Sequence, residues 1–168
     1  TVQWTGASST LQEILNIEVL PGVPVSVVLS GCSEVLTANT SCDLFGSAYD
    51  QFSNVVWFDD VTGYTLSATD GETTKIISPT PHNLPPSTDI LIGEYTGNFV
   101  GQWSIILTTD LGISDSITVD VTHGVLESFE LSSSSPTITA DDLLFINATR
   151  IDVRGNQLPV SYTHLRAH

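Results

Sequence analysis

The 168-residue sequence is poor in basic residues and contains no methionine. Only 4 Lys and Arg stand against 19 Asp and Glu, which gives a formal net charge of −15. A surface this acidic repels nucleic acids and anionic membranes, so we expect neither as a partner. It suits a saline medium outside the cell, where dissolved salt screens the repulsion between like charges.

Long apolar runs and familiar catalytic motifs are also missing. No stretch of about 18 apolar residues occurs, so the sequence predicts no transmembrane span. G-x-S-x-G, H-E-x-x-H and Gly-rich phosphate loops are absent as well. His82 lies in a proline-rich stretch and His123 follows an expected strand, and no spacing places a Ser and an Asp beside either for a triad. We therefore expect no enzymatic activity, no catalytic residue and no cofactor.

What the sequence does contain is an internal repeat with an offset of 102 residues. Between residues 15–54 and 117–156, eleven pairs are identical without a gap. Turn residues and alternating apolar positions keep register together, which favours a true repeat over chance similarity of Ser-, Thr- and Val-rich strands. The identical pairs are Val19/Val121, Gly22/Gly124, Val23/Val125, Ser26/Ser128, Leu29/Leu131, Ser30/Ser132, Ser33/Ser135, Thr37/Thr139, Ala38/Ala140, Asp50/Asp152 and Asn54/Asn156.

The repeat predicts where domains begin and end. Residues 1–20 are interpreted as the closing strands of one domain, with strands at Val2–Trp4 and Leu11–Val19. Residues 21–122 form a complete domain, and residues 123–159 open a following one. The neighbouring domains of the same chain are thus the first partners we expect.

Short alternating segments separated by turn residues predict an all-β fold. In 101–124 the pattern indicates a hairpin, with Trp103, Ile105 and Leu107 alternating along its first arm. The other strands are expected at 23–30, 35–37, 41–50, 55–58, 63–68, 73–78 and 89–95, and 63–78 should form a hairpin. Their number and spacing favour an antiparallel immunoglobulin-like β-sandwich. Trp57 and Trp103 are core candidates, although aromatics displayed for sugar stacking are the alternative.

The two cysteines, Cys32 and Cys42, are disulfide candidates. The second repeat has Ser134 and Leu144 at these positions, so both cysteines are absent together. Joint gain or loss indicates a bridge rather than two free thiols, and a bridge implies an oxidising compartment. No C-x-x-C or Cys/His cluster predicts a metal site.

Aspartates and asparagines offer weaker hypotheses. Asp59-Asp60, Asp70 and Asp141-Asp142 lack the D-x-D-x-D-G run of a calcium loop, so we interpret them as turn residues. A Ca²⁺ site at a domain junction stays open as an alternative. Asn39-Thr-Ser and Asn147-Ala-Thr match the N-glycosylation sequon.

Several segments resemble the bacterial immunoglobulin-like, or Big-type, domain. They are EYTGNFVGQWSIILTTDLGISDSITVDV, which is similar to its closing strands, and LSSSSPTITADD…IDVRGN and VLSGCSEVLTANT…AYDQFSN, which are similar to its opening. The second copy keeps the D-x-x-G-N turn of that family at 152–156, whereas the first has Ser53 in place of Gly. The resemblance covers 1–159 and implies tandem domains on exported bacterial and archaeal surface proteins, where they act as spacers or adhesin stalks.

The last nine residues, 160–168, do not continue the repeat. Their sequence, VSYTHLRAH, resembles the translation of a sequencing-library adapter, so we interpret it as a non-native tail and leave it out of the fold prediction.

Three functions remain as hypotheses. The first is a non-enzymatic structural or adhesive stalk segment of an extracellular, surface-attached protein. The second is a binding module for surface glycans or proteins, which an exposed strip of aromatic residues would favour. The third is an accessory region of a secreted hydrolase.

Overall fold

The computed structural model describes residues 3–5, 10–12, 17–56, 63–80, 88–133, 137, 139 and 146–159. In these residues all regular secondary structure is β-strand, and they include no helix that could cross a membrane. The strands are β1 (Gln3–Thr5), β2 (Thr10–Gln12), β3 (Ser26–Gly31), β4 (Val35–Thr37), β5 (Ser41–Tyr49), β6 (Val55–Val56), β7 (Tyr64–Thr69), β8 (Thr74–Ile77), β9 (Ile90–Thr96), β10 (Gly101–Thr109), β11 (Ser114–Thr122), β12 (Leu126–Ser133), β13 (Ile146–Asp152) and β14 (Gln157–Leu158).

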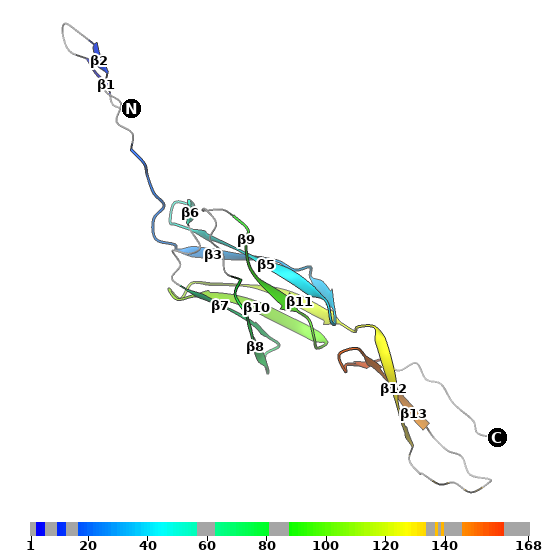
Figure 1. The fold of residues 1–168 in the computed structure, drawn as a ribbon. Helices are drawn as coiled ribbons and strands as arrows, with labels where there is room; N and C mark the ends of the chain where they lie inside the picture. Colours follow the sequence, from blue (N-terminus) through cyan, green and yellow to red (C-terminus); the bar gives the residue numbers. More distant parts are fainter. Residues whose placement is uncertain are drawn as a thin grey trace.

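Strands β3 to β11 form two sheets that face each other (Figure 1). One sheet has the order β4-β11-β10-β7-β8, and in the other β5 pairs with β3, β6 and β9. A hairpin pair, β7 and β8, lies beside a second hairpin pair, β10 and β11, as in the immunoglobulin-like sandwich. We refer to β3–β11 as the sandwich.

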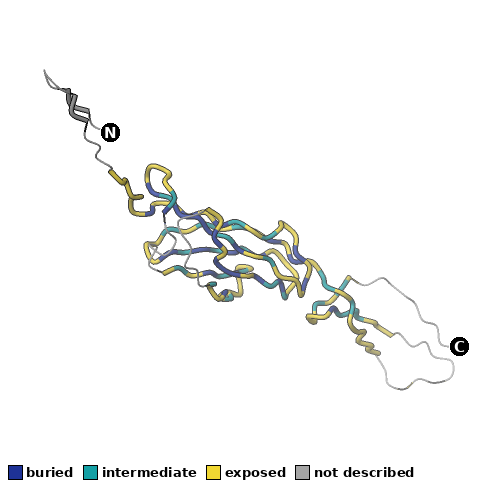
Figure 2. The backbone as a smooth tube through the Cα atoms, turned by 45° about the horizontal axis from the view of Figure 1, so that its top comes forward, coloured by how far each residue is buried: buried dark blue, intermediate teal, exposed yellow. Residues whose placement is uncertain are grey.

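One hydrophobic core fills the space between the two sheets. Alternate side chains point inward because successive residues of a strand face opposite sides. Leu66, Ile105 and Leu107 from one sheet and Leu44 and Ile92 from the other are fully buried. Figure 2 shows the buried segments running along the middle of this layer pair. Trp103 is buried as the sequence predicts, whereas Trp57 lies outside the described residues.

The strand β4 departs from a purely antiparallel sandwich. It pairs in parallel with β11 in the opposite sheet, Leu36 lying opposite Val121. The chain leaves β3 through Gly31, whose φ is 105°, and a Cβ there would lie 2.1 Å from the Asp43 carbonyl oxygen. Only glycine fits this turn. The chain segment that contains β3 and β4 is therefore divided between the two sheets. The sequence of β4 has only three residues and does not indicate which sheet it joins.

Two smaller sheets lie outside the sandwich. Strands β1 and β2 form an antiparallel hairpin, as the sequence predicts. The expected strand at 11–19 is wrong at 17–19, because these residues belong to no strand, while 13–16 lie outside the described residues. Strands β12, β13 and β14 form an antiparallel sheet, which we call the C-terminal sheet. The tail 160–168 lies outside the described residues.

Candidate functional site at the repeat junction

A turn at residues 50–54 holds the start of the sandwich through one carboxylate. Asp50 Oδ2 accepts a hydrogen bond from the Gly22 N–H at 2.8 Å and one from the Asn54 side-chain amide at 2.9 Å. Asp50 Oδ1 accepts from the N–H groups of Phe52 at 2.8 Å and Asn54 at 2.9 Å. The carboxylate therefore connects the turn to the entering chain 28 residues earlier.

The same constellation occurs 102 residues later around Asp152. Its Oδ2 accepts from the Gly124 N–H at 2.8 Å and its Oδ1 from the N–H groups of Arg154 and Asn156 at 2.9 and 2.8 Å. The Asn156 side-chain amide also donates to Oδ2 at 2.9 Å. The residues that are identical in sequence also make the same four hydrogen bonds around their aspartate, and Asn156 adds a fifth to Asp152 Oδ1, so the repeat is one of geometry as well as of sequence.

The pKa values of both carboxylates are lowered, and the largest cause acting on the pKa differs between the two. For Asp50, the side-chain hydrogen bond from Asn54 and then the bond from Gly22 lower the pKa from 3.8 to about 2. For Asp152, burial acts to raise the pKa, but the hydrogen bonds from Asn156, Gly124 and Arg154 outweigh it and leave the pKa at about 2. Each carboxylate is thus ionised and already surrounded by N–H donors.

Asn156 also reaches across to the sandwich. Its side-chain nitrogen donates to the Asn98 carbonyl at 3.0 Å, and its side-chain oxygen accepts from the Val100 N–H at 3.2 Å. One amide therefore binds a carbonyl and an N–H group of the loop between β9 and β10. We call these two hydrogen bonds the Asn156 latch. In the sequence Asn156 is recognisable as a repeated turn residue, but this contact is not predicted.

The chain itself passes close to the sandwich at the same place. A Cβ at Gly124 would lie 2.9 Å from the Ala38 carbonyl oxygen, so a side chain there would push the two parts apart. His123 lies beside it, and its ring Nε2 is 2.9 Å from the Gln157 carbonyl oxygen. His123 therefore lies at the junction, whereas His82 falls outside the described residues.

At the end of the sandwich nearest the C-terminal sheet, backbone hydrogen bonds and a disulfide connect neighbouring segments. The Asn39 N–H donates to the Gly97 carbonyl at 2.7 Å, and the Gly97 N–H donates to the Thr40 carbonyl at 3.1 Å. Cys32 and Cys42, which are joined by a disulfide with their Cα atoms 5.0 Å apart, connect the end of β3 to the start of β5 just beyond this pair. The loop that accepts the latch is therefore held by backbone bonds on its other side.

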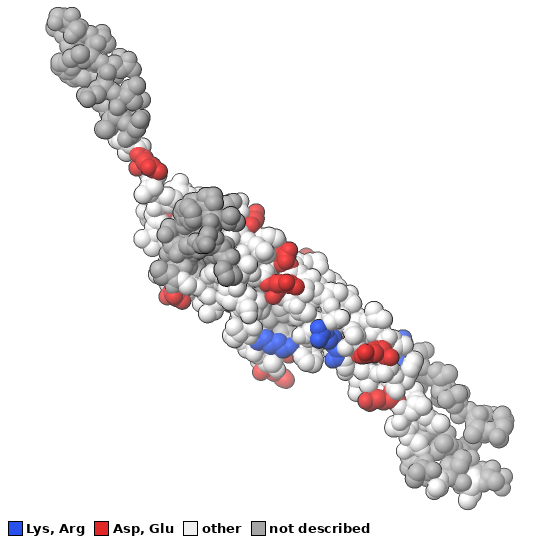
Figure 3. Space-filling model, viewed as in Figure 1, with Lys and Arg blue, Asp and Glu red and all other residues white. Residues whose placement is uncertain are grey.

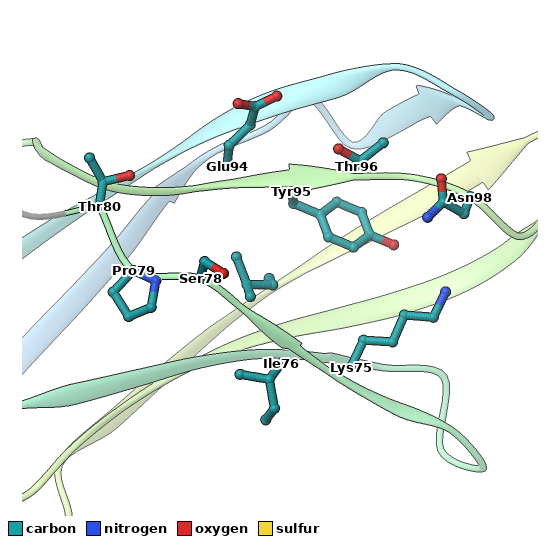
Figure 4. A pocket seen from close by; sticks show the side chains of 10 residues that line it. Lys75, Ile76, Ser78, Pro79, Thr80, Glu94, Tyr95, Thr96 and Asn98 are labelled. Atoms are coloured by element: carbon teal, nitrogen blue, oxygen red, sulfur yellow. The ribbon is translucent and has the colours of Figure 1, made fainter.

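A shallow hollow of about 540 Å³ lies beside the junction, between β8 and β9. In Figure 4 the Lys75 ammonium and the Tyr95 hydroxyl both point to the end of the hollow where Asn98 lies. Lys75 Nζ is 4.1 Å from the centre of the Phe99 ring and 4.9 Å from that of Trp103, which are cation–π distances. Burial, with a smaller contribution from the negative charge of Asp70, raises the pKa of Tyr95 to about 12, so its hydroxyl stays protonated near neutral pH.

The remaining residues singled out from the sequence are the aspartates considered for Ca²⁺ and the asparagines of the two N-glycosylation sequons. Asp70 accepts hydrogen bonds from the N–H groups of Glu72 and Thr73, which is the turn role the sequence predicts, while Asp59-Asp60 and Asp141-Asp142 lie outside the described residues. No group of three or more His, Cys, Asp or Glu side chains converges in the described part of the chain. Of the two sequons, Asn39 occupies a turn with a φ of 72° and Asn147 lies on β13, and both residues are exposed.

Charge is distributed unevenly over the molecule. On the face shown in Figure 3, acidic side chains are scattered along the sandwich, while the basic side chains gather toward the end that meets the C-terminal sheet. The described basic residues are Lys75, Arg150 and Arg154. Exposed aromatic residues do not form a strip in the described chain. Phe52 lies in the turn at 50–54, Phe99 in the loop between β9 and β10, and Phe129 on β12.

Comparison with known proteins finds a similarity to solved structures. No family model matches the chain, and no curated protein matches it. Among solved structures, the chain is similar to one titled "Structure of the S-layer protein SbsC, domains 5-6", with 15% sequence identity and a TM-score of 0.39. The match covers 80% of this chain and 66% of the other, just under two thirds of its length.

Proposed function

We propose that this chain is a non-enzymatic spacing segment of an exported cell-surface protein, in which tandem immunoglobulin-like domains are joined by short, oriented junctions. In this proposal residues 1–20 close one domain, 21–122 form the next, and 123–159 open a third. The observation that carries the proposal is the Asn156 latch, which binds the turn of one repeat to the loop of the repeat before it.

The latch restricts rotation as well as separation. A single covalent connection leaves two bodies free to swivel, whereas two hydrogen bonds from one planar amide fix a direction. The Asn156 side-chain nitrogen also donates to both carboxylate oxygens of Asp152. These bonds within the turn fix the orientation of the amide that contacts the loop. Each net hydrogen bond contributes about 1 kcal/mol, so the latch biases the orientation without making the junction irreversible.

Composition supports an exported location for such a segment. The Cys32–Cys42 disulfide suits an oxidising compartment, and the net charge of −15 keeps neighbouring molecules apart in saline surroundings. The proposal includes no catalysis, and the carboxylates of Asp50 and Asp152 already accept hydrogen bonds from N–H donors.

Glycan binding is a second candidate, favoured by the hollow between β8 and β9. Lys75, Tyr95 and Asn98 present a cation, a hydroxyl and an amide there, and Phe99 exposes half of its surface nearby. Saturable binding of an acidic oligosaccharide that is lost in Lys75→Ala would support this role. Titration calorimetry on the intact chain tests it.

The spacing role is tested by measuring how residues 126–158 tumble relative to the sandwich. In ¹⁵N relaxation measurements on the intact chain, we expect the amides of β12–β14 to report the same rotational correlation time as those of β10 and β11. Asn156→Ala should shorten the correlation time of β12–β14 relative to that of β10 and β11, because a segment freed from the latch reorients faster than the whole.

Asn54→Ala is the matched control. Asn54 holds Asp50 as Asn156 holds Asp152, so the two substitutions remove the same bonds within a turn. Only Asn156 also contacts the preceding loop in the described structure. If β12–β14 already tumble independently in the unmodified chain, or if Asn54→Ala changes their motion equally, the oriented-junction proposal is wrong.

A further inference from the structure

Two basic residues from different repeats lie at the junction, although the chain is otherwise acidic. Lys75 Nζ is 4.1 Å from the centre of the ring of Phe99, which belongs to the loop that accepts the Asn156 latch. Arg154 lies two residues before Asn156 in the turn at 152–156. On the face shown in Figure 3, basic side chains gather where the sandwich meets the C-terminal sheet. We call Lys75 and Arg154 the junction cations.

Neither junction cation is neutralised by a carboxylate. In the part of the chain that the structure describes, neither Lys75 nor Arg154 forms an ion pair, although the sequence holds 19 Asp and Glu residues. Asp70 is close enough to Lys75 to interact electrostatically, but its carboxylate accepts hydrogen bonds from the N–H groups of Glu72 and Thr73. In a chain this acidic, two cations without a carboxylate partner are available to an anionic ligand.

The exposure of Arg154 is a property of the turn and is expected in a completed domain as well. By the 102-residue offset its counterpart is Phe52, which is 75% exposed in the complete sandwich. Arg150, in contrast, corresponds to Ala48, which is buried in the sandwich core, so Arg150 is not one of the junction cations. The hollow beside Lys75 lies between β8 and β9, within the sandwich itself. Both halves of the site are therefore surface features of whole domains.

The hollow places neutral polar groups beside the cations. The Tyr95 hydroxyl and the Asn98 amide lie at the same end of the hollow as the Lys75 ammonium (Figure 4). The Asn98 side-chain oxygen is buried and has no hydrogen-bond partner among the described residues, and the neighbouring Phe99 is 51% exposed. Hydroxyl and amide groups beside an aromatic ring suit a sugar, and the cations suit carboxylates. A short oligosaccharide that carries carboxylates combines both kinds of group.

We propose that the junction binds a uronate-containing oligosaccharide, with one carboxylate at Lys75 in the hollow and a second at Arg154 of the following repeat. This site rests on the glycan-binding role proposed above and goes further, because the following repeat completes it. An arginine binds a carboxylate through two parallel N–H donors. A ligand that contacts both repeats favours the orientation in which the Asn156 latch is formed, so the ligand and the latch should strengthen each other.

The charge of the rest of the chain sets the conditions for binding. The formal net charge of −15 repels a polyanion, and acidic side chains are scattered along the sandwich (Figure 3). At 0.15 M salt the screening length is about 8 Å, so repulsion from distant carboxylates is reduced, while contacts inside the site keep most of their attraction. A short oligouronate at this salt concentration is therefore the appropriate probe.

Titration calorimetry with tetragalacturonate on the intact chain at 0.15 M salt tests the site. The unmodified chain should bind it saturably and should not bind maltotetraose, a neutral oligosaccharide of the same length. Lys75→Gln and Arg154→Gln should each weaken binding about tenfold or more, because each removes a charge-assisted contact. Arg150→Gln removes the same charge from β13 and should bind like the unmodified chain. Arg154→Gln keeps the backbone N–H that binds Asp152, so the turn should be preserved.

The coupling to the latch is tested by ¹⁵N relaxation with and without the ligand. In Asn156→Ala, saturating tetragalacturonate should lengthen the correlation time of β12–β14 toward that of β10 and β11. The same variant should bind the ligand more weakly than the unmodified chain, because part of the binding free energy is then used to orient the junction. Asn54→Ala is the control, and neither quantity should change in it.

The outcomes separate this site from the roles proposed above. If Lys75→Gln weakens binding but Arg154→Gln does not, or if Asn156→Ala binds as tightly as the unmodified chain, the hollow binds glycans without bridging the junction and the inference is wrong. Absence of tetragalacturonate binding, or equal affinity for inorganic phosphate, would overturn both this site and the glycan-binding role. The spacing role is measured without ligand and is unaffected by either result.

Discussion

Ser53 and Gly155 occupy the same position in two turns that share every main hydrogen bond. The Ser53 N–H donates to the Asp50 carbonyl at 3.0 Å, and the Gly155 N–H donates to the Asp152 carbonyl at 2.9 Å. The φ angles are 64° and 82°, both in the left-handed region. Glycine adopts this region without a steric cost, whereas serine does not. The first repeat therefore holds a strained residue where the second has the unstrained one.

We predict that Ser53→Gly stabilises the sandwich. Removing the left-handed strain gains about 1–2 kcal/mol, and the extra freedom of glycine in the unfolded chain offsets about 0.5–1 kcal/mol of it. The net gain should raise the melting temperature by roughly 3–6 °C for a domain of this size. Gln51→Gly in the same turn is the control and should lower the melting temperature, since Gln51 is not among the residues with positive φ. Equal shifts for both variants would contradict the strain argument.

Acid should destabilise the sandwich in a defined range of pH. Asp50 has a pKa of about 2 in the folded chain against an ordinary value of 3.8, so the unfolded chain binds more protons between these values. The stabilisation from the ionised carboxylate is fully present above pH 4–5 and is lost as the pH falls toward 2. Urea unfolding at a series of pH values should show the free energy of unfolding falling across this range.

Asp50→Asn tests the source of that pH dependence. The variant should be less stable at pH 7, because an amide does not accept four N–H bonds as a carboxylate does, and its stability should vary less between pH 4 and 2. Asp43→Asn, which removes an exposed charge from β5, controls for the change in net charge. If Asp50→Asn keeps the full pH dependence of the unmodified chain, other carboxylates are responsible.

Local patterns in the sequence were sufficient for most strands of the sandwich but not for the contacts between distant segments. The alternation in 101–124 and the Gly-containing turn at Thr69-Asp70-Gly71 predicted the β10–β11 and β7–β8 hairpins, because pairing there is between neighbours in sequence. The parallel partner of β4 could not be predicted, since three residues fit either sheet. The Gly22–Asp50 bond spans 28 residues, but its signal was present: both residues recur, identical, 102 positions later.

The Asn156 latch had no such signal. Asn54 and Asn156 are an identical pair, and the role they share is the bond to the aspartate of their own turn. The partners of the latch, the Asn98 carbonyl and the Val100 N–H, are backbone groups, which carry no residue-specific mark in a sequence. Contacts of this kind become visible only when the two repeats are placed in space.

The cysteine pair gives a third prediction. We expect peptide mass mapping without reductant to find Cys32 joined to Cys42 in protein exported to an oxidising compartment. Replacing both by serine should cost about 2–3 kcal/mol of stability, because a bridge across a short loop restricts the unfolded chain. Serine is the residue that the second repeat has opposite Cys32, so this change introduces no foreign side chain at that position. Recovery of two freely alkylated thiols would contradict the prediction.

The last prediction concerns the smallest part of the chain that folds alone. The buried hydrophobic residues of the described core lie between Val27 and Val121, so a fragment of residues 21–122 contains all of them and also keeps the Gly22–Asp50 bond. It should unfold cooperatively, with a melting temperature within a few degrees of the intact chain, because removing the C-terminal sheet breaks the Asn156 latch but takes no residue from the buried core. A fragment of residues 25–122 has the same core but lacks Gly22, and should melt at a lower temperature because Asp50 loses one donor. Calorimetry of the two fragments separates the outcomes. Non-cooperative unfolding of 21–122 would show that the domain boundary is misplaced, and equal melting temperatures would show that the entry bond does not contribute.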